Sequence, residues 1–373
     1  MINAGITGWG KCMPPAVLSN ADLATIVDTS DDWITTRTGI KERRISHVEV
    51  SDLAVVAIHR ALAAAGREPE DLDLIILATC TGDSIIPSTS STIQHKLGAI
   101  NAATFDLNAA CSGFVYSLVV GSNMIRAGTN RVVAVVGAEK LHYHIDFTDR
   151  STAVLFGDGA GAVILEPCDP SIGLLSSELG MDGSVAGILA VPRDWTRGDR
   201  RPSSPADGGI RMDGPEVFRR AVTTMGGASV RVVEKANLAL EEVDLLIPHQ
   251  ANMRIIDATA RRLKLDPSQV FINIQSYGNT SAATIPVALA EAVEDGRVRP
   301  GANIVFAAFG AGLSWAAALL RWGERVEPLR TSAVELPPTE RSAMDLMEPN
   351  LEFFGRPGGP AESGSDPVPA APR

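Results

Sequence analysis

Cys111 is the first residue of this chain that could do chemistry. It lies in the run Asn108-Ala-Ala-Cys-Ser-Gly-Phe, and an apolar stretch with helical periodicity follows directly. This pattern predicts a helix over Ser112–Ala127 with the thiol at its N-terminus. Unpaired backbone N–H groups and the helix dipole favour an anion there, and the thiolate is the nucleophilic form of cysteine. On its own, Cys111 could equally be a small packing residue.

Two polar residues in the second half of the chain are further candidates. His249 follows Leu245-Leu-Ile-Pro, a buried strand, so its imidazole emerges where α/β proteins place ligand-binding loops. Asn279, in Tyr277-Gly-Asn-Thr-Ser-Ala-Ala, precedes another apolar helix. Taken singly, His249 could be a satisfied core histidine and Asn279 a helix N-cap.

The elements that must position these residues alternate between apolar strands and Ala-rich helices, which predicts an α/β fold. Continuous apolar runs indicate strands buried on both faces, at Leu74–Ala78, Val132–Val136, Leu245–Ile247 and Ile304–Ala308. Helices are predicted over Ser88–Leu97 and Ile255–Leu263. The uncharged run Ile304–Leu320 is shorter than the roughly 20 residues of a membrane span. Gly310 and Gly312 interrupt it, which favours two buried strands joined by a tight turn.

An internal repeat is indicated by three pairs of residues at similar offsets. Asp73 and Asp244 each open a strand and lie 171 residues apart; Cys111 and Asn279 lie 168 apart, and Gly137 and Gly310 lie 173 apart. We therefore predict two α/β halves, over 1–170 and 171–323, with Cys111 and Asn279 at equivalent corners. The Pro-, Gly-, Glu- and Ser-rich remainder, 324–373, is predicted to be a disordered tail in which Leu351–Phe354 could dock.

Composition narrows the classes of function. The chain has 373 residues, 45% of them apolar, and a net charge of -11, which argues against nucleic acid as the main partner. The first ten residues lack the basic and apolar regions of a signal peptide, so a cytoplasmic location is expected. No pair among the four cysteines has CxxC spacing, and a cytosolic chain of this size needs no disulfides, so neither a zinc site nor a disulfide framework is expected.

Together the motifs resemble those of β-ketoacyl-acyl carrier protein synthase III, a thiolase-fold condensing enzyme. The resemblance runs over about 1–323 and is carried, in family order, by Trp33-Ile with Arg37-Thr-Gly-Ile-Lys-Glu-Arg, Asn108-Ala-Ala-Cys-Ser-Gly-Phe, Phe156-Gly-Asp-Gly-Ala-Gly-Ala, Pro248-His-Gln-Ala-Asn, Tyr277-Gly-Asn-Thr-Ser-Ala-Ala and Phe309-Gly-Ala-Gly-Leu-Ser-Trp. It implies a five-layer αβαβα sandwich of two related halves, a homodimer, and the substrates acyl-CoA and malonyl-acyl carrier protein. No metal or redox cofactor is expected.

The resemblance also implies a role for each candidate. Cys111 would take an acyl group from acyl-CoA, with its own N–H and that of Ala311 forming an oxyanion hole. His249 and Asn279 would donate hydrogen bonds to the malonyl thioester carbonyl, where charge develops on loss of carbon dioxide. The resulting carbanion would attack the acyl-cysteine and give a 3-oxoacyl thioester, the first condensation of type II fatty acid synthesis.

Three further groups of residues match positions that bind substrates in this family. Those matching the CoA site are Trp33, Arg37, Arg150 and Asn252. Those matching the acyl pocket are Ile86, Leu141 and Phe156, and Ile86 matches a residue that can reach into the neighbouring subunit's pocket. Those matching a basic patch for the carrier protein are Arg219, Arg254, Arg261 and Arg262.

Two other functions stay open. A specialised homologue could use the same Cys-His-Asn site in a natural-product pathway, an alternative that the C-terminal extension and the unusual His142-Tyr-His144 keep open. The His142-Tyr-His144 segment beside Leu141 also indicates that a polar or atypical acyl group is an option. A catalytically silent scaffold could instead bind carrier protein only, and its Cys111 would titrate as an ordinary thiol near pH 8.5.

Overall fold

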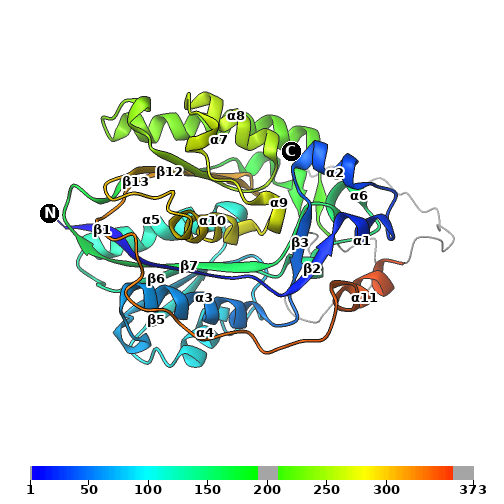
Figure 1. Cartoon of the computed structure of the whole chain (residues 1–373), viewed down its shortest axis with the longest axis horizontal. Coiled ribbons are helices and arrows are strands. Elements are labelled where there is room, and N and C mark those ends of the chain that lie inside the picture. Colours follow the sequence, from blue (N-terminus) through cyan, green and yellow to red (C-terminus); the bar gives the residue numbers. More distant parts are fainter. Residues whose placement is uncertain (1, 192–208, 356–373) are drawn as a thin grey trace.

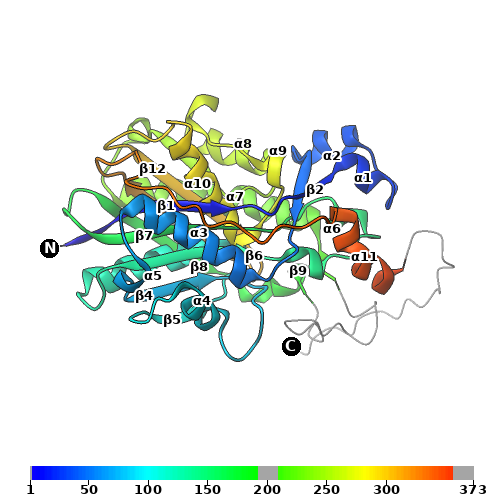
Figure 2. The same ribbon diagram turned by 60° about the horizontal axis from the view of Figure 1, so that its bottom comes forward.

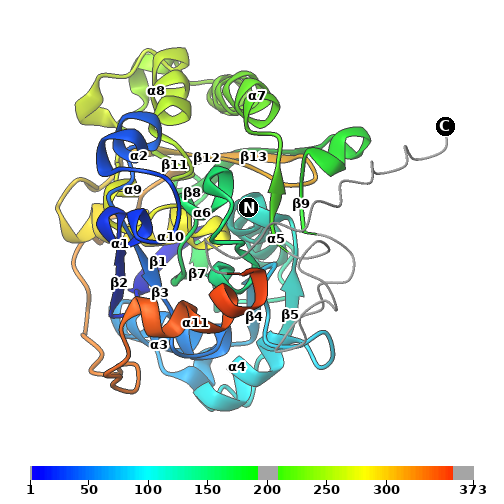
Figure 3. The same cartoon turned by 90° about the vertical axis from the view of Figure 1, so that its right-hand side faces the viewer.

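The computed structural model describes residues 2–191 and 209–355, and they form five layers of alternating helices and sheets. Figures 1 and 3 show the order of the layers: one helical layer outside each sheet, and a helical layer between the sheets. The outer helices are α3 (Val50–Ala65) and α4 (Thr89–Leu97) on one side, and α7 (Gly214–Lys235) and α8 (Met253–Arg262) on the other. The central pair is α5 (Gly113–Arg126) and α10 (Thr284–Glu294). The predicted five-layer architecture is therefore confirmed.

Each large sheet draws its strands from one half of the chain. The first has the order β1-β7-β6-β4-β5, with bounds Asn3–Cys12, Gly159–Cys168, Val133–Glu139, Leu74–Ala78 and Ala103–Leu107. The second has the order β11-β12-β13-β8, with bounds Leu245–Pro248, Asn303–Gly310, Ser314–Arg321 and Gly173–Met181. The uncharged run at 304–320 forms β12 and β13, an antiparallel pair, as predicted. No helix in the described part of the chain is long and apolar enough to cross a membrane.

Smaller elements surround one end of the sandwich. Two short ribbons pair β2 (Ala16–Ser19) with β3 (Glu42–Ile45), and β9 (Leu189–Ala190) with β10 (Arg211–Met212). The remaining α-helices are α1 (Asn20–Ala24), α2 (Asp31–Thr38), α6 (Arg150–Ala153), α9 (Ile274–Tyr277) and α11 (Ala343–Phe354). Short 3-10 helices that matter for the site are η2 (Ala110–Ser112), η3 (Leu141–His144) and η8 (Ser281–Ala283).

The central helices α5 and α10 are buried on most of their surface, because each is covered by both sheets and by the other helix. Phe114 and Leu118 of α5 pack in one core cluster with Ile285 and Leu289 of α10. Both helices are preceded by a 3-10 turn whose entry residue has a positive φ, 46° at Ala110 and 50° at Ser281. These two residues lie 171 apart, so they mark the true register of the repeat.

The register corrects one detail of the sequence prediction. At an offset of 171, the counterpart of Asn279 is Asn108, and the counterpart of Cys111 is Ala282. The Oδ1 atoms of both asparagines accept a hydrogen bond from the backbone N–H two residues on, at 3.2 Å for Asn108 and 2.8 Å for Asn279. Cys111 and Asn279 therefore lie near equivalent corners but three positions out of register.

Strand β6 lies between β7 and β4 in the middle of its sheet, and the edge strands are β1 and β5. One other expectation is wrong. The segment 324–373 is not disordered throughout. Residues 324–341 run along α3 as an extended strap and lead to α11, while the part of the tail after residue 355 lies outside the described residues (Figure 2).

The strap and α11 are held by hydrogen bonds and by apolar packing that composition alone did not reveal. The amides of Leu329 and Arg330 donate to the carbonyls of Ala64 and Ala63 at the end of α3. Helix α11 begins with a capping box formed by Ser342 and Asp345. It buries three large apolar side chains, each worth about 1.5–3 kcal/mol on full burial: Leu346, Met347 and Leu351.

Candidate active site

Cys111, His249 and Asn279 line one cavity of about 400 Å³ at the centre of the molecule. Cys111 comes from the first half, at the N-terminal end of α5, and the other two come from the second half. All three side chains are buried, with 9%, 2% and 6% exposure. The convergence on which the sequence interpretation depended is therefore present.

Close packing of the backbone fixes the position of Cys111. Gly310, at the end of β12, lies so near that a Cβ there would be 2.7 Å from the Cys111 nitrogen. Ser314 Oγ donates to the Ala109 carbonyl at 2.9 Å and contacts Ser112 Oγ at 3.1 Å. The second half of the chain thus holds the turn η2 on which the cysteine sits. Ala311, the residue expected to complete the oxyanion hole, follows Gly310 and lines a second cavity that also contains Cys111.

The environment of the thiol differs from the sequence expectation of a thiolate. Burial raises the pKa of Cys111 to about 12, the Ser281 hydroxyl lowers it, and the negative charge of Glu139 raises it. The N-terminus of α5 acts in the direction of lowering. Because burial dominates, the resting side chain is a thiol, and its proton must leave when the sulfur attacks a substrate.

His249 is placed by β11 and oriented by α10. Its amide donates to the Ala307 carbonyl on the neighbouring strand at 2.7 Å. Its Nδ1 lies 2.6 Å from Oγ1 of Thr284, the first residue of α10, so Nε2 is left for the cavity. Burial lowers the pKa of His249 to about 3, and the ring is neutral at physiological pH.

Asn279 joins the two halves of the chain. Its backbone pairs with Leu155–Gly157 in a short parallel bridge, with bonds of 2.9 and 3.0 Å. Its Oδ1 accepts from the amide of Ser281 at 2.8 Å, so the side-chain NH₂ is the group left for the cavity. Asn279 is not the N-cap of the following helix, because Thr280 caps η8 and Ala283 caps α10, and its NH₂ remains a donor.

Glu139 and Ser281 are site residues that the sequence interpretation missed. Glu139 is fully buried at the end of β6, and Ser281 Oγ donates to its Oε1 at 2.9 Å. The carboxylate also accepts from Thr79 Oγ1 at 3.0 Å, from the Cys80 amide at 3.1 Å and from Thr81 Oγ1. Burial raises the pKa of Glu139. The only signal in the sequence was an acidic residue, Glu139, at the end of an apolar strand. Nothing in the sequence linked Glu139 to Ser281.

The residues predicted to bind CoA surround the outer end of the cavity. Trp33, Arg37 and Asn252 line it, and the Asn252 side chain donates to the Arg37 carbonyl at 3.2 Å while capping α8. Arg37 and Arg150 lie over the Trp33 indole, with guanidinium carbons 4.5 and 4.6 Å from the ring centroid. Arg150 therefore rests directly on Trp33, and an adenine could enter between them only if this contact opens.

The four arginines of the predicted basic patch are not equivalent. Arg254 lines the cavity at the start of α8, and Arg261 and Arg262 are exposed at its end. Within residues 2–191 and 209–355, no carboxylate lies within ion-pair distance of these three. Arg219, on α7, instead forms an ion pair with Glu216 at 2.6 Å, and the same carboxylate also pairs with Arg220.

The second cavity at Cys111 has a volume of about 440 Å³ and an apolar lining, as an acyl pocket requires. Leu141 and Phe156 line it as predicted, together with His144, Met181, Leu189 and Ile210. Ile86 lies elsewhere: its side chain is 87% exposed on the loop before α4. His142 does not line this cavity, since its Nδ1 contacts Asp158, whose other oxygen accepts from the His142 amide at 3.1 Å.

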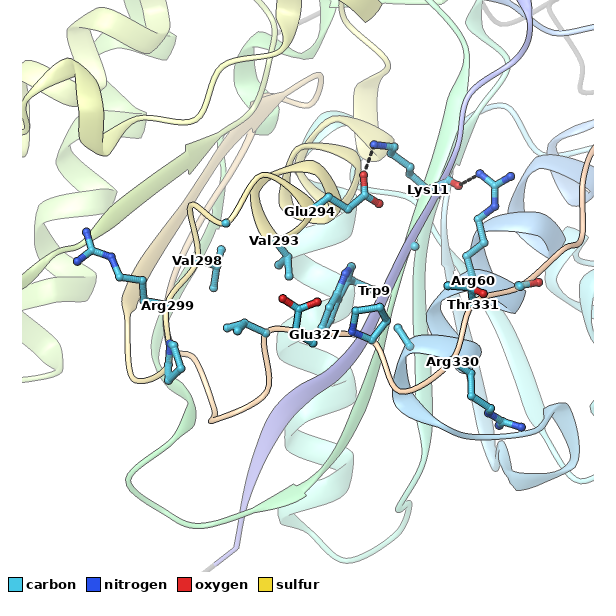
Figure 4. A pocket seen from close by; sticks show the side chains of 17 residues that line it. Trp9, Lys11, Arg60, Val293, Glu294, Val298, Arg299, Glu327, Arg330 and Thr331 are labelled. Atoms are coloured by element: carbon cyan, nitrogen blue, oxygen red, sulfur yellow. Dashed lines mark hydrogen bonds and ion pairs between the residues drawn. The ribbon is translucent and has the colours of Figure 1, made fainter.

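A third cavity, of about 600 Å³, is remote from these residues. It lies between the C-terminal strap, β1 and the end of α10, and Figure 4 shows Glu327 and Arg330 of the strap around Trp9. Lys11 is paired there with Glu294 at 2.6 Å, and Arg60 donates to the Lys11 carbonyl at 2.8 Å. It contains none of the predicted site residues. Among the described residues, no group of three or more His, Cys, Asp or Glu could hold a metal ion.

Comparisons with known proteins agree with this geometry. Residues 105–183 match the family model described as 3-oxoacyl-[acyl-carrier-protein] synthase III, and residues 233–322 match its C-terminal model. A relative in Vibrio vulnificus, named beta-ketoacyl-[acyl-carrier-protein] synthase III 2, is 51% identical over 350 residues, 94% of this chain and 97% of its own. The solved 3-oxoacyl-[acyl-carrier-protein] synthase III of Aquifex aeolicus is 46% identical, with a TM-score of 0.81 over 86% of this chain and all of that one.

A third relative differs in the length that it shares. The beta-ketoacyl-[acyl-carrier-protein] synthase III of Roseiflexus castenholzii is 49% identical over 323 residues, 86% of this chain but 98% of its own. The match with the Vibrio protein covers 350 of the 373 residues, so it must extend beyond residue 322 into the strap.

Proposed function

Because the chain belongs to the 3-oxoacyl-[acyl-carrier-protein] synthase III family, we propose that it condenses an acyl-CoA primer with malonyl-acyl carrier protein and so initiates type II fatty acid synthesis. The products are a 3-oxoacyl-acyl carrier protein, carbon dioxide and free CoA. The observation that carries this proposal is the convergence of Cys111, His249 and Asn279 on one buried cavity.

In the first half-reaction, the sulfur of Cys111 attacks the thioester carbonyl of acyl-CoA. The thiol proton leaves toward the CoA sulfur, a C–S bond to Cys111 forms, and the bond to CoA breaks. The backbone N–H groups of Cys111 and Ala311 stabilise the tetrahedral oxyanion, since both residues lie beside Gly310 where the two halves of the chain touch. The acyl chain then occupies the cavity lined by Leu141 and Phe156.

In the second half-reaction, His249 and Asn279 hold the carbonyl oxygen of the malonyl thioester. Asn279 has only its NH₂ available, and His249 can donate from Nε2 if Thr284 gives its proton to Nδ1. Both donors are neutral, so they stabilise the enolate that forms on loss of carbon dioxide without first protonating it. The enolate carbon attacks the carbonyl of acyl-Cys111 and forms the new C–C bond, the C–S bond breaks, and the departing Cys111 sulfur takes up a proton from solvent to restore the thiol. Loss of carbon dioxide drives the reaction, so we propose that no cofactor is needed.

We also propose a cytoplasmic homodimer built on two related halves, 1–170 and 171–323. Support for the dimer comes from the unpaired edge of β5 and from exposed apolar side chains near it: Ile85, Ile86 and Ile100, at 60%, 87% and 75% exposure. A free strand edge and exposed large apolar side chains both favour association with another chain. Sedimentation velocity measures the oligomeric state, and a monomer at micromolar concentration would contradict this part.

The decisive experiment incubates the pure protein with a panel of acyl-CoAs and malonyl-acyl carrier protein. We expect carbon dioxide release coupled to formation of a 3-oxoacyl-acyl carrier protein, and an acyl adduct on Cys111 when malonyl-acyl carrier protein is left out. If none of the acyl-CoA primers in the panel gives carbon dioxide release, the proposal is excluded. Transfer of the acyl group to another acceptor without release would indicate the specialised class of homologue instead.

A further inference from the structure

The C-terminal helix α11 packs against the wall of the acyl cavity. Its buried residues Leu346, Met347 and Leu351 belong to the same core cluster as Leu141, Phe156 and Ile210, three residues that line the cavity. Helix α11 contacts β2 and β3 at the right-hand end of the molecule in Figure 1. Helix α11 lies beyond the family match, which ends at residue 322, and it nevertheless contributes to the wall of the substrate pocket.

Asn350 makes the most specific contact between α11 and this wall. Its side chain is 1% exposed, and its NH₂ donates to the carbonyls of His142 at 2.6 Å and Ile145 at 3.1 Å. His142 lies within the 3-10 turn η3 and Ile145 directly follows it, and Leu141 and His144 of this turn line the acyl cavity. One side chain of the extension thus holds the turn at its second residue and just after its end.

The last turn of α11 lies beside a second segment of the same wall, Gly209–Ile210. A Cβ added at Gly209 would lie 3.6 Å from the Phe354 ring, and the next residue, Ile210, donates its amide to the His144 carbonyl at 2.8 Å. Two stretches that line the cavity, η3 and Ile210, are therefore joined to each other and both contacted by α11.

The volume of the cavity bears on the acyl group that it takes. A methylene occupies a volume close to that of a water molecule in the liquid, about 30 Å³. An acetyl group would leave most of the 440 Å³ unfilled, and the lining is chiefly apolar. Burying further methylenes there is favourable by the hydrophobic effect.

We propose that α11, through Asn350, is the specificity-determining element of the acyl pocket, and that the pocket it shapes selects aliphatic chains of several carbons over acetyl. The inference rests on the proposed function, because it concerns the primer of that reaction. Asn350 touches no reacting atom, so it is a positioning residue. The match with the Vibrio relative covers 94% of this chain, so it extends beyond residue 322 into the C-terminal extension.

The test measures covalent loading of Cys111 by mass spectrometry with acetyl-CoA and octanoyl-CoA in competition, using the full chain. The wild type is expected to load octanoyl in preference to acetyl. Asn350→Ala should lower the ratio of octanoyl to acetyl loading by about tenfold. Asn350→Asp, which has the same shape but no donor, should lower this ratio at least as much. Glu352→Ala, on the exposed side of the same helix, is the matched control and should keep the wild-type ratio.

Malonyl-acyl carrier protein decarboxylation separates specificity from a general loss of structure. Its kcat and KM should stay at wild-type values in Asn350→Ala, because that substrate does not use the acyl pocket. If Asn350→Ala does not fold, Phe354→Ala loosens only the end of α11 and should shift the ratio in the same direction. Loading with an unchanged ratio, or an acetyl preference in the wild type, overturns the inference. Failure of every acyl-CoA to load overturns the proposed function itself.

Discussion

The Nδ1 atom of His249 lies 2.6 Å from Oγ1 of Thr284, and the same hydroxyl lies 3.0 Å from the Ser281 carbonyl. The hydroxyl has a single proton to give to one of these two neighbours. When it is given to the imidazole, Nε2 carries the ring proton and can donate to a substrate carbonyl; when it is given to the carbonyl, Nε2 becomes an acceptor. Thr284 thus selects the tautomer of the histidine.

Replacing Thr284 by Val should therefore impair the step that needs a donor at Nε2. We expect malonyl decarboxylation to fall by about tenfold or more, because the ring loses both its orientation and its tautomer preference. Acyl loading of Cys111 should change little. Thr284→Ser keeps the hydroxyl and is the control; an equal loss in both variants would show that the methyl group, and not the hydrogen bond, is what matters.

The three central residues should separate into two half-reactions. Cys111→Ala is expected to abolish acyl transfer while malonyl decarboxylation persists. His249→Ala and Asn279→Ala should still form the acyl-enzyme but lose condensation by about 10²–10³-fold each, the usual effect of removing one donor to a developing oxyanion. Intact-mass spectrometry follows the first half-reaction and carbon dioxide release the second. Equal loss of both in all three variants would contradict this division.

Titration of the Cys111 thiol should follow its burial. Because its pKa is raised, to about 12, the thiol form prevails at neutral pH, and alkylation should accelerate steadily from pH 7 to pH 10 without a plateau. Ser281→Ala removes a group that lowers this pKa and should slow alkylation at a given pH. Glu139→Gln removes a negative charge that raises the pKa and should accelerate it. Rapid alkylation that levels off below pH 7 would refute this ordering.

The lowered pKa of His249, about 3, predicts how decarboxylation depends on pH. A group with a depressed pKa of this kind stays neutral until the pH falls through that value. Malonyl decarboxylation by the Cys111→Ala variant, which isolates this step, should therefore show no inflection near pH 6.5, where a solvent-exposed histidine would titrate. An inflection there that disappears in the additional variant His249→Gln would mean that the imidazole is charged in the working enzyme.

The exposed arginines on α8 should affect the carrier protein and not the malonyl group. Arg254→Glu and Arg261→Glu are expected to raise the KM for malonyl-acyl carrier protein several-fold, with a stronger effect at low salt, because a like charge repels an acidic partner. Arg219→Ala is the comparison, and its effect should be smaller because Arg219 already has the acidic partner Glu216. Malonyl-CoA, which lacks the carrier protein, supplies the control. The KM of the Arg261→Glu variant for malonyl-CoA should stay unchanged.

Much of this protein could be predicted from the sequence, because local patterns encode it. Buried strands are continuous apolar runs, so β4 and the β12–β13 pair were predicted nearly to the residue. Cys111, His249 and Asn279 were identified because each lies in a motif at the end of a strand or the start of a helix. The motifs also indicated the order and the duplication of the two halves, although the exact register of the repeat needed the positive φ of Ala110 and Ser281.

Contacts between distant segments were decided only by the tertiary structure. Neither the pairing of Ser281 with Glu139 nor that of Asn350 with the carbonyls around η3 leaves a trace in local composition, because the partners are 142 and more than 200 residues apart. The Pro-rich extension was predicted to be disordered because its residues bury little surface by themselves, but its described part, residues 324–355, docks on α3 and beside η3. The charge state of Cys111 likewise depends on how deeply the thiol is buried. The sequence predicts that the thiol lies at a helix N-terminus but does not give its burial.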